Sequence, residues 1–425
     1  KYVIHTRPVP HRFETITKSG IIAWEEGCLK CAVCVKKQCV YKVYENRGMN
    51  ARQMIDSIDN QCMNCLRCVQ NCPKELIHKS INPEYKAIGD FHWTPDIMSE
   101  IVRPTRDGIH GREYISTATD LGRTLKHLVF SDEGDLEGLP ILIDIPLPII
   151  MRYPAFGAIS QDGLKGWAMA AKRLGTLLAV PHGLIDGELK EFRPHLVPVI
   201  GAGETVEDLG DNIRMIEIQW EEGWTKRIHE IAKLHPSALI SARLPLSVGV
   251  EEKILSLADA GVSIFNLEGS FNGMTWDEEP LFIKDGIRSV HLALVEAGIR
   301  DEVTLLVSGG IAMAEHVAKA IICGVDAVYV DFPILIALEC RMCRRCEREL
   351  SCPVEIEKAS SKWIAARTVN LLGAWHNQLL EVMGAMGIRD VRRVRGEAGR
   401  AMFFDELDKS IFGSLDRVEE GCELE

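Results

Sequence analysis

The chain has 425 residues, which is enough for two or three domains with at least one large apolar core. Its net charge is −12 and no long basic stripe is present, so nucleic acid is not expected as a partner. The most apolar stretch, residues 139–150, contains Asp144 and three prolines and is too short to span a bilayer, so we expect no membrane-spanning segment.

Cysteine is the most informative residue type. All cysteines except Cys422 lie within residues 28–72 or 323–352, which is too clustered for a disulfide framework. Clustered free thiols are typical of a reducing compartment, so we expect a cytoplasmic protein. Cys323 lies within a helical stretch and is expected in the core rather than as a ligand.

Residues 1–90 are polar and carry two cysteine motifs in succession. Their cysteines are Cys28, Cys31, Cys34, Cys39 and then Cys62, Cys65, Cys68, Cys72, the last of which is followed by proline. This spacing is typical of a ferredoxin with two 4Fe-4S clusters, in which each motif gives three thiolates to one cluster and its last thiolate to the other. Zinc would leave the third cysteine of each run without a role. We therefore predict a ferredoxin-like iron–sulfur domain over residues 1–90.

Residues 91–138 carry mixed charge and several turn residues, and we expect a connecting segment. Short β-branched runs then alternate with helical stretches, as in a parallel sheet covered on both faces. The runs are 141–145, 176–180, 196–200, 215–220, 238–244, 262–267, 304–307 and 327–330. Eight such units predict an α/β fold of the (β/α)8 TIM barrel type over residues 139–338. A doubly wound open sheet is the alternative, although no GxGxxG motif follows the first run.

A third cysteine motif follows the last predicted strand. Cys340, Cys343, Cys346 and Cys352 would place a cluster beside the barrel mouth, within a C-terminal region over residues 339–425. Four thiolates suit a 4Fe-4S cluster, three would suit a 3Fe-4S cluster with one cysteine idle, and zinc is the other alternative. Further along, Leu371, Trp375, Leu379, Val382 and Met386 form a stripe at helical spacing that we expect to pack on the barrel.

Active sites of such barrels lie at the carboxyl ends of the strands, and phosphate groups often bind after strands seven and eight. Here strand seven leads into Ser308, Gly309 and Gly310, and a helix begins soon afterwards. Backbone amides at a helix start can bind an anion, although a Gly-Gly pair alone often marks only a turn. A flavin mononucleotide (FMN) phosphate is the occupant we expect beside iron–sulfur clusters.

Five segments together resemble the FMN-binding region of archaeal-type glutamate synthases. They are the charged run 98–116, residues 156–160 at the first barrel loop, residues 308–311, the motif that ends at Cys352, and the final helix with Asn370, Trp375 and Gln378. The resemblance covers about residues 95–390. It implies FMN at the barrel mouth, a nearby iron–sulfur cluster, and reduction of 2-iminoglutarate formed from 2-oxoglutarate and ammonia.

The resemblance also implies flavin contacts, which would fall on Ala155, Phe156, Gly157, Gln219, Arg243, Ser308, Gly309, Gly310 and Asp331. Arg243 stands where the family has a lysine that faces the flavin, and a guanidinium there would stabilise the anionic reduced ring; a surface ion pair is the alternative. His182 would either face the flavin or cap a loop. Arg243 and His182 are thus the candidate catalytic residues. Asp331 is unfavourable beside a phosphate unless it instead orients a backbone amide.

Several family motifs are replaced. Residues 181–184, 220–224, 267–270 and 331–332 differ from the family's glycine-rich substrate and phosphate loops, and Glu221, Glu222 and Glu268 would repel an anionic dicarboxylate. We therefore predict an iron–sulfur flavoprotein oxidoreductase that relays electrons between 4Fe-4S clusters and FMN within a larger complex, with other redox subunits or a ferredoxin-type carrier as partners. The alternative is a glutamate synthase large subunit. A metal-binding scaffold without redox activity is a third hypothesis.

Overall fold

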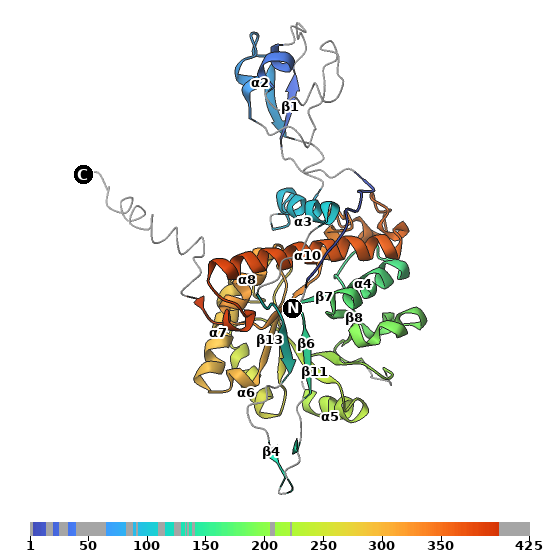
Figure 1. Ribbon diagram of the computed structural model, residues 1–425, viewed down its shortest axis with the longest axis vertical. Coiled ribbons are helices and arrows are strands. Elements are labelled where there is room, and N and C mark those ends of the chain that lie inside the picture. The colour runs from blue at the N-terminus through green and yellow to red at the C-terminus, as the bar shows by residue number, and fades with distance from the viewer. Residues whose placement is uncertain are drawn as a thin grey trace, which may run out of the picture.

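A computed structural model describes residues 3–13, 20–24, 33–39, 65–81, 88–90, 92–108, 115–122, 129–131, 133, 136–137, 141–204, 209–221 and 223–398. Its centre is a closed barrel of eight parallel strands, with helices on the outside (Figure 1). The strands are β7 (Ile149–Arg152), β8 (Leu178–Pro181), β9 (Leu196–Ile200), β10 (Met215–Gln219), β11 (Leu239–Pro245), β12 (Ile264–Glu268), β13 (Thr304–Ser308) and β14 (Ala327–Val330). Each strand pairs with its neighbour in sequence, and β14 pairs with β7 to close the ring. The predicted TIM barrel is confirmed.

The first predicted barrel strand was wrong. Residues 141–145 form β6 (Leu142–Ile145), which pairs antiparallel with β3 (Thr119–Gly122) outside the barrel. Burial alternates along β6, as expected for an antiparallel strand with one exposed face, whereas all four residues of β7 are buried. Two prolines separate β6 from β7 in an otherwise apolar run, and the sequence reading merged the two strands.

The β3–β6 pair closes the amino-terminal end of the barrel. Leu121, Ile143 and Ile145 pack against inward-facing apolar side chains from the barrel strands. The hydroxyl of Thr304, at the start of β13, donates to the Gly122 carbonyl. With this end closed by an apolar layer, the polar chemistry of the barrel is confined to its carboxyl end.

Helices surround the barrel, although the described part of the β9–β10 connection contains none. The α-helices of the body are α3 (Pro95–Asp107), α4 (Gln161–Leu174), α5 (Trp224–Leu234), α6 (Val250–Asp259), α7 (Ile283–Glu296), α8 (Ala314–Cys323), α9 (Phe332–Ile336) and α10 (Ser361–Ala385). Short 3-10 turns are η3 (His182–Leu184), η4 (Gly187–His195), η5 (Arg300–Glu302), η6 (Arg345–Arg348), η7 (Ile356–Lys358) and η8 (Val391–Arg393).

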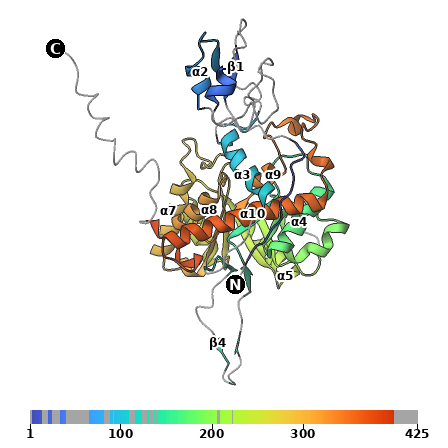
Figure 2. The same cartoon turned by 45° about the horizontal axis from the view of Figure 1, so that its top comes forward.

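The predicted C-terminal stripe is confirmed as a packing surface. α10 lies across the outside of the barrel and packs against α3, α4 and α8 (Figure 2). Leu371, Trp375 and Leu379 are buried there. None of the described helices is long and apolar enough to cross a membrane.

The predicted ferredoxin-like region is described only in part. It contains β1 (Gly20–Trp24) paired antiparallel with β2 (Ile77–Ile81), the π-helical turn η1 (Cys34–Gln38) and α2 (Arg67–Gln70). Cys28, Cys31 and Cys62 of the predicted cluster ligands lie outside the described residues.

A small hairpin, β4 (Val129–Phe130) with β5 (Leu136–Glu137), extends from the barrel body.

The N-terminal residues 3–13 belong to the barrel body by their contacts. The buried carboxylate of Glu339 accepts hydrogen bonds from the backbone N–H groups of Arg12 (2.9 Å) and Phe13 (3.1 Å). Trp363 of α10 donates to the Pro10 carbonyl at 3.2 Å. These residues therefore form a strap that is bound next to the third cysteine motif.

Candidate functional site at the barrel mouth

Arg243 lies at the centre of a polar network at the carboxyl end of the barrel. It is the fifth residue of β11, and its guanidinium donates to Glu268 at 3.1 Å and to Gln219 at 2.9 Å. Its Nε lies 3.6 Å from Glu217. Arg243 and Gln219, both expected as flavin contacts, lie side by side, and Glu268 is their near neighbour. Strands four, five and six of the barrel thus present their polar side chains to one another.

Glu217 is the fully buried member of this network. Its carboxylate forms an ion pair with Arg152 of β7 and accepts a hydrogen bond from Asn266 of β12 at 2.9 Å. The Arg152 guanidinium also stacks on the Tyr329 ring, with 4.8 Å between them. Burial keeps the pKa of Tyr329 well above its usual value, so this hydroxyl stays protonated. One buried carboxylate therefore lies between the buried Arg152 and the partly buried Arg243.

The network leaves polar atoms without partners. Six buried side-chain atoms on the barrel strands make no hydrogen bond to any described residue: Arg152 Nη1, Ser241 Oγ, Arg243 Nε, Asn266 Oδ1, Ser308 Oγ and Tyr329 Oη. A buried polar atom without a partner costs about 1–3 kcal/mol, so native proteins rarely keep one without water or a ligand beside it. Their gathering in one barrel indicates a polar ligand or ordered water at the mouth.

The loop after β13 contains two glycines with left-handed backbone and three backbone amides without an acceptor among the described residues. Gly309 and Gly310 both have left-handed backbone, with φ of 96° and 69°. A Cβ on Gly309 would lie 2.3 Å from the Gly269 carbonyl oxygen, so glycine is needed because the loop after β12 packs directly on this one. Within the described part of the chain, the backbone N–H groups of Gly309, Gly310 and Ile311 donate to no acceptor. The packing explains the glycines, and the free amides supply an anion cradle.

Asp331 caps a helix. Its carboxylate accepts from the Phe332 backbone N–H at 2.6 Å, which places it at the N-cap of α9. Burial raises its pKa, while that hydrogen bond and the charge of Arg152 act in the opposite direction. Asp331 therefore orients a backbone amide, which was the alternative role considered from the sequence.

The acidic side chains at the mouth are largely compensated. Glu268 is paired with Arg243, and Glu221 is paired with Arg227 and accepts from the Gly203 backbone N–H at 2.8 Å. The expected repulsion of an anionic substrate by Glu221 and Glu268 is therefore reduced, because Arg227 lies beside Glu221 and Arg243 lies beside Glu268. Glu222 lies outside the described residues.

His182 does not join the Arg243 network. It begins η3 after β8, and its Nδ1 lies 3.2 Å from Glu204, so it links the loops after the second and third strands. Its side chain is 28% exposed. Of the two roles considered for His182, capping a loop fits this position better than facing the flavin.

The third cysteine motif packs against the loop after β7. Burial raises the pKa of the Cys346 thiol, and the nearby Gly157 backbone N–H opposes this shift. The Met342 N–H donates to Cys340 Sγ at 3.4 Å. Burial, with smaller contributions from Cys352, Cys343 and Cys346, raises the pKa of Cys340 to about 12. The four thiols are therefore close enough to interact. No three His, Cys, Asp or Glu side chains of the described residues are arranged to hold a single metal ion.

Backbone strain is concentrated around these cysteines. Of eight described non-glycine residues with positive φ, five lie between residues 339 and 355. Arg344 follows the middle cysteine of its motif and precedes a short helix, and Leu66 does the same after Cys65. Such conformations cost of order 1–3 kcal/mol each and persist where the surroundings fix them. The two motifs thus share a left-handed residue after the middle cysteine and a short helix that carries the next one, Cys346 or Cys68.

Aromatic side chains separate the cysteine loop from the barrel interior. The Phe156 ring packs on Phe332 at 4.8 Å, and both Phe332 and Phe271 lie in the same cluster as Trp93. The Arg344 guanidinium lies over Phe156 at 5.0 Å and over Phe271 at 4.8 Å. Phe156 and Gly157, expected as flavin contacts, therefore also contact the cysteine loop, whereas Ala155 is exposed.

Comparison with known proteins relates these features to a family. A profile described as the conserved region in glutamate synthase matches residues 208–389. The archaeal glutamate synthase (NADPH) of Archaeoglobus fulgidus is 23% identical over 491 aligned residues, which cover 92% of this chain and 95% of the relative. The archaeal-type enzyme of Dehalococcoides mccartyi is 25% identical and covers 88% and 92%. Over most of its length the chain is therefore similar to archaeal-type glutamate synthases. This similarity supports an oxidoreductase.

Two further similarities are shorter or more distant. The ferredoxin-dependent glutamate synthase of Cyanidium caldarium is 30% identical over 142 residues, which are 32% of this chain and 9% of the relative. Among solved structures, mandelate oxidase with benzoyl-formic acid aligns with a TM-score of 0.41 and 16% identity, covering 66% of this chain and 85% of that one. This structural likeness is too distant to bear on the site.

The similarity to glutamate synthases implies FMN, and the residues at the mouth fit it. The unpaired amides of the 309–311 loop and the partnerless Ser308 hydroxyl are donors that a phosphate would accept from. Arg243 offers a positive charge at the centre of the mouth, where reduced flavin carries negative charge. Asp331 does not oppose this fit, because its carboxylate already caps α9.

Sequence reasoning missed Arg152, Glu217 and Asn266. A signal was present for Glu217, because a carboxylate stands in the middle of the otherwise apolar run Met215–Gln219. In a strand buried on both faces, a charged residue indicates a partner inside the barrel. Arg152 was missed because β7 itself was not predicted.

Proposed function

We propose that this glutamate synthase-like chain is an iron–sulfur flavoprotein that passes electrons between a cluster on Cys340, Cys343, Cys346 and Cys352 and an FMN at the barrel mouth. The N-terminal cysteines would hold two further 4Fe-4S clusters and receive electrons from a ferredoxin-type carrier or another redox subunit. The observation that carries the proposal is the contact between the cysteine loop and the loop after the first barrel strand, where the Arg344 guanidinium lies 5.0 Å from the centre of the Phe156 ring.

The chain's own residues have separate tasks in this proposal. The 308–311 loop would bind the FMN phosphate, and Arg243, fixed by Glu268, Gln219 and Glu217, would face the ring. FMN when bound takes up electrons in pairs or singly, which suits it to exchange with one-electron clusters. The aromatic cluster around Phe156 and Phe332 excludes water between the cysteine loop and the barrel.

A stopped-flow experiment tests the electron path. A reduced ferredoxin-type carrier is mixed anaerobically with FMN-loaded protein, and flavin reduction is followed by its absorbance. We expect Cys343→Ala to slow flavin reduction by about tenfold or more with FMN content unchanged, because the third cluster loses a ligand. The matched control is Cys323→Ala, which removes a buried thiol of α8 away from the motif. Equal rates in wild type and Cys343→Ala would contradict the proposal.

A second candidate function is reduction of 2-iminoglutarate, the reaction of a glutamate synthase large subunit. One observation favours it: Glu221 and Glu268 are paired with arginines, so they present no uncompensated charge to a dicarboxylate. The same reduced sample distinguishes the two functions when 2-oxoglutarate and ammonium are added. Rapid flavin reoxidation with formation of glutamate supports turnover at this site. Unchanged, fully reduced flavin supports an electron relay that serves another subunit.

A further inference from the structure

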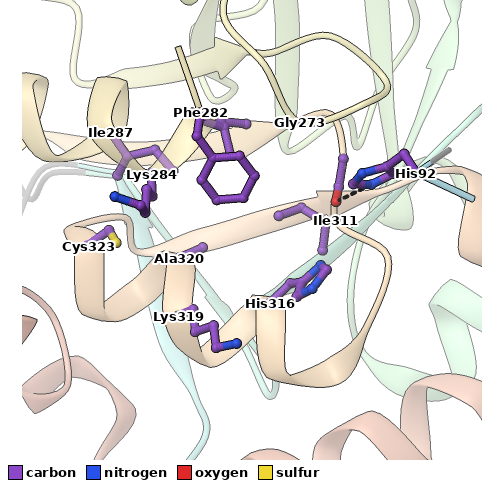
Figure 3. Close-up of a pocket in the computed structure, with 12 residues that line it drawn as sticks. His92, Gly273, Phe282, Lys284, Ile287, Ile311, His316, Lys319, Ala320 and Cys323 are labelled. Carbon is purple, nitrogen blue, oxygen red and sulfur yellow. Dashed lines mark hydrogen bonds between the residues drawn. The ribbon is translucent and has the colours of Figure 1, made fainter. Parts of the chain in front are cut away.

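Two histidines from distant parts of the chain hold the backbone of the loop after β13. His92, which lies just before α3, donates from Nε2 to the Gly310 carbonyl oxygen at 3.1 Å. His316 of α8 lies on the same loop, and its Nδ1 accepts from the Ala312 N–H at 3.2 Å. Figure 3 shows both rings beside Ile311, with the bond from His92 drawn as a dashed line.

This arrangement fixes the direction of the next amide. A trans peptide is planar, with its C=O and N–H pointing in opposite directions. Because the Gly310 carbonyl points toward His92, the N–H of Ile311 points away from it. Ile311 is buried, and its N–H has no acceptor among the described residues. The nearby Ser308 hydroxyl is also without a partner, and its residue is only 4% exposed. Two unsatisfied donors of one loop therefore indicate an acceptor-rich ligand.

His92 belongs to a turn that joins three loops at the mouth. Gly89 donates to the Arg341 carbonyl of the cysteine loop at 3.1 Å. Trp93, fully buried, donates from its indole to the Phe271 carbonyl of the loop after β12 at 3.1 Å. Asp90 accepts from the backbone N–H groups of both His92 and Trp93, at 2.9 Å and 2.8 Å. The turn therefore links the cysteine loop and two barrel loops.

We propose that His92 and His316 are positioning residues, which orient the 308–311 loop so that its amides face a bound phosphate. The inference rests on the proposed function, since the phosphate is that of FMN. It further assigns the turn before α3 to the flavin site, although this turn lies outside the barrel strands. Neither histidine would touch the reacting ring.

The histidines can be replaced without disturbing the main core. Both rings line a cavity of about 290 Å³ between α7 and α8, which also borders Phe282, Ile287 and Ala320. A smaller side chain at His92 enlarges a space that already exists, so His92→Ala is expected to fold. His92→Gln keeps an N–H donor on a side chain of similar reach.

The test measures binding of FMN and of riboflavin, which lacks the phosphate, to the reconstituted apoprotein by quenching of flavin fluorescence. We expect His92→Ala to weaken FMN binding about tenfold and to leave riboflavin binding unchanged, with His92→Gln close to wild type. His316→Ala should act in the same direction. The matched control is His229→Ala, an exposed histidine of α5, which should bind both ligands like wild type.

Each other outcome has a defined meaning. If His92→Ala binds FMN as tightly as wild type, or loses FMN and riboflavin equally, the positioning role is wrong while the proposed function stands. If wild type binds riboflavin and FMN with the same affinity, no phosphate site exists at this loop and the inference is overturned. If wild type binds neither flavin, the proposed function itself fails, and the inference fails with it.

Discussion

At the scale of single residues, charge compensation inside the barrel is uneven. Glu217 is fully buried between Arg152 and Arg243, whereas the Glu268 side chain is 27% exposed and pairs with Arg243 alone. Loss of a buried partner leaves a charge that neither water nor protein compensates, while loss of an exposed one is screened. The two glutamates therefore form a matched pair for measuring what the buried position contributes.

We expect Glu217→Gln to lower the free energy of unfolding by about 3 kcal/mol or more, because the buried Arg152 and the partly buried Arg243 lose their shared anion. Glu268→Gln should lower it by less than about 1 kcal/mol. Urea unfolding followed by fluorescence at neutral pH measures both. Equal losses for the two variants would show that Glu217 is not the main counter-ion of the arginines.

At the scale of elements, the contact between α4 and α10 depends on a glycine. A Cβ on Gly166 would lie 2.7 Å from the Ile364 Cβ and 2.8 Å from the Ser361 carbonyl oxygen. Backbone and Cβ atoms cannot move aside as the end of a long side chain can. The α10 helix can therefore approach α4 this closely only while position 166 has no side chain.

Gly166→Ala should destabilise the protein by about 1–3 kcal/mol despite the better helix propensity of alanine, because α10 must shift outward. Gly384→Ala is the control within α10, since its added methyl group meets only Ile115 Cδ1, at 3.7 Å. That change should be neutral or stabilise by up to about 1 kcal/mol. Thermal unfolding of both variants tests the pair, and a stabilised Gly166→Ala would contradict the packing argument.

Most of the barrel could be predicted because strands buried on both faces read as short apolar runs. Seven of the eight runs, from 176–180 to 327–330, correspond to β8–β14. Residues 141–145 misled the prediction, since an antiparallel pair that closes the barrel end is almost as apolar as a barrel strand. At the site, Arg243 and the 308–311 loop were predictable from their places after strands. His92 and Arg152 were not, because a sequence does not show which distant loops meet.

At the scale of the whole molecule, four partly or fully buried histidines favour the neutral form. Burial lowers the pKa values of His92, His291, His316 and His376, in the last case to about 4. As the pH falls, these side chains bind protons near pH 6.5 in the unfolded chain but only at a lower pH in the folded chain. The contribution of these side chains to the free energy of unfolding is therefore fully present above about pH 6.5 and is lost as the pH falls toward 4.

His376 is the clearest single case, because its ring is almost fully buried in α10 and lies 3.0 Å from the Thr117 hydroxyl. We expect wild type to lose about 3 kcal/mol through this group between pH 6.5 and 4, and His376→Gln to lack that share of the loss. Urea unfolding at a series of pH values measures the difference, with His229→Gln as the exposed control. Parallel pH profiles for wild type and His376→Gln would contradict the assignment.

The strap of residues 3–13 has a consequence for how the molecule can be divided. The chain is bound to the barrel body at Phe13, through Glu339, and again at Gly89, through the Arg341 carbonyl two residues further on. The predicted iron–sulfur unit is therefore attached like an insertion, with both of its ends at one place on the body. A fragment that begins after residue 90 would lack the strap and leave the buried Glu339 without two of its donors. Removal of residues 14–87 as a cassette, with the two ends joined, would keep the strap in place.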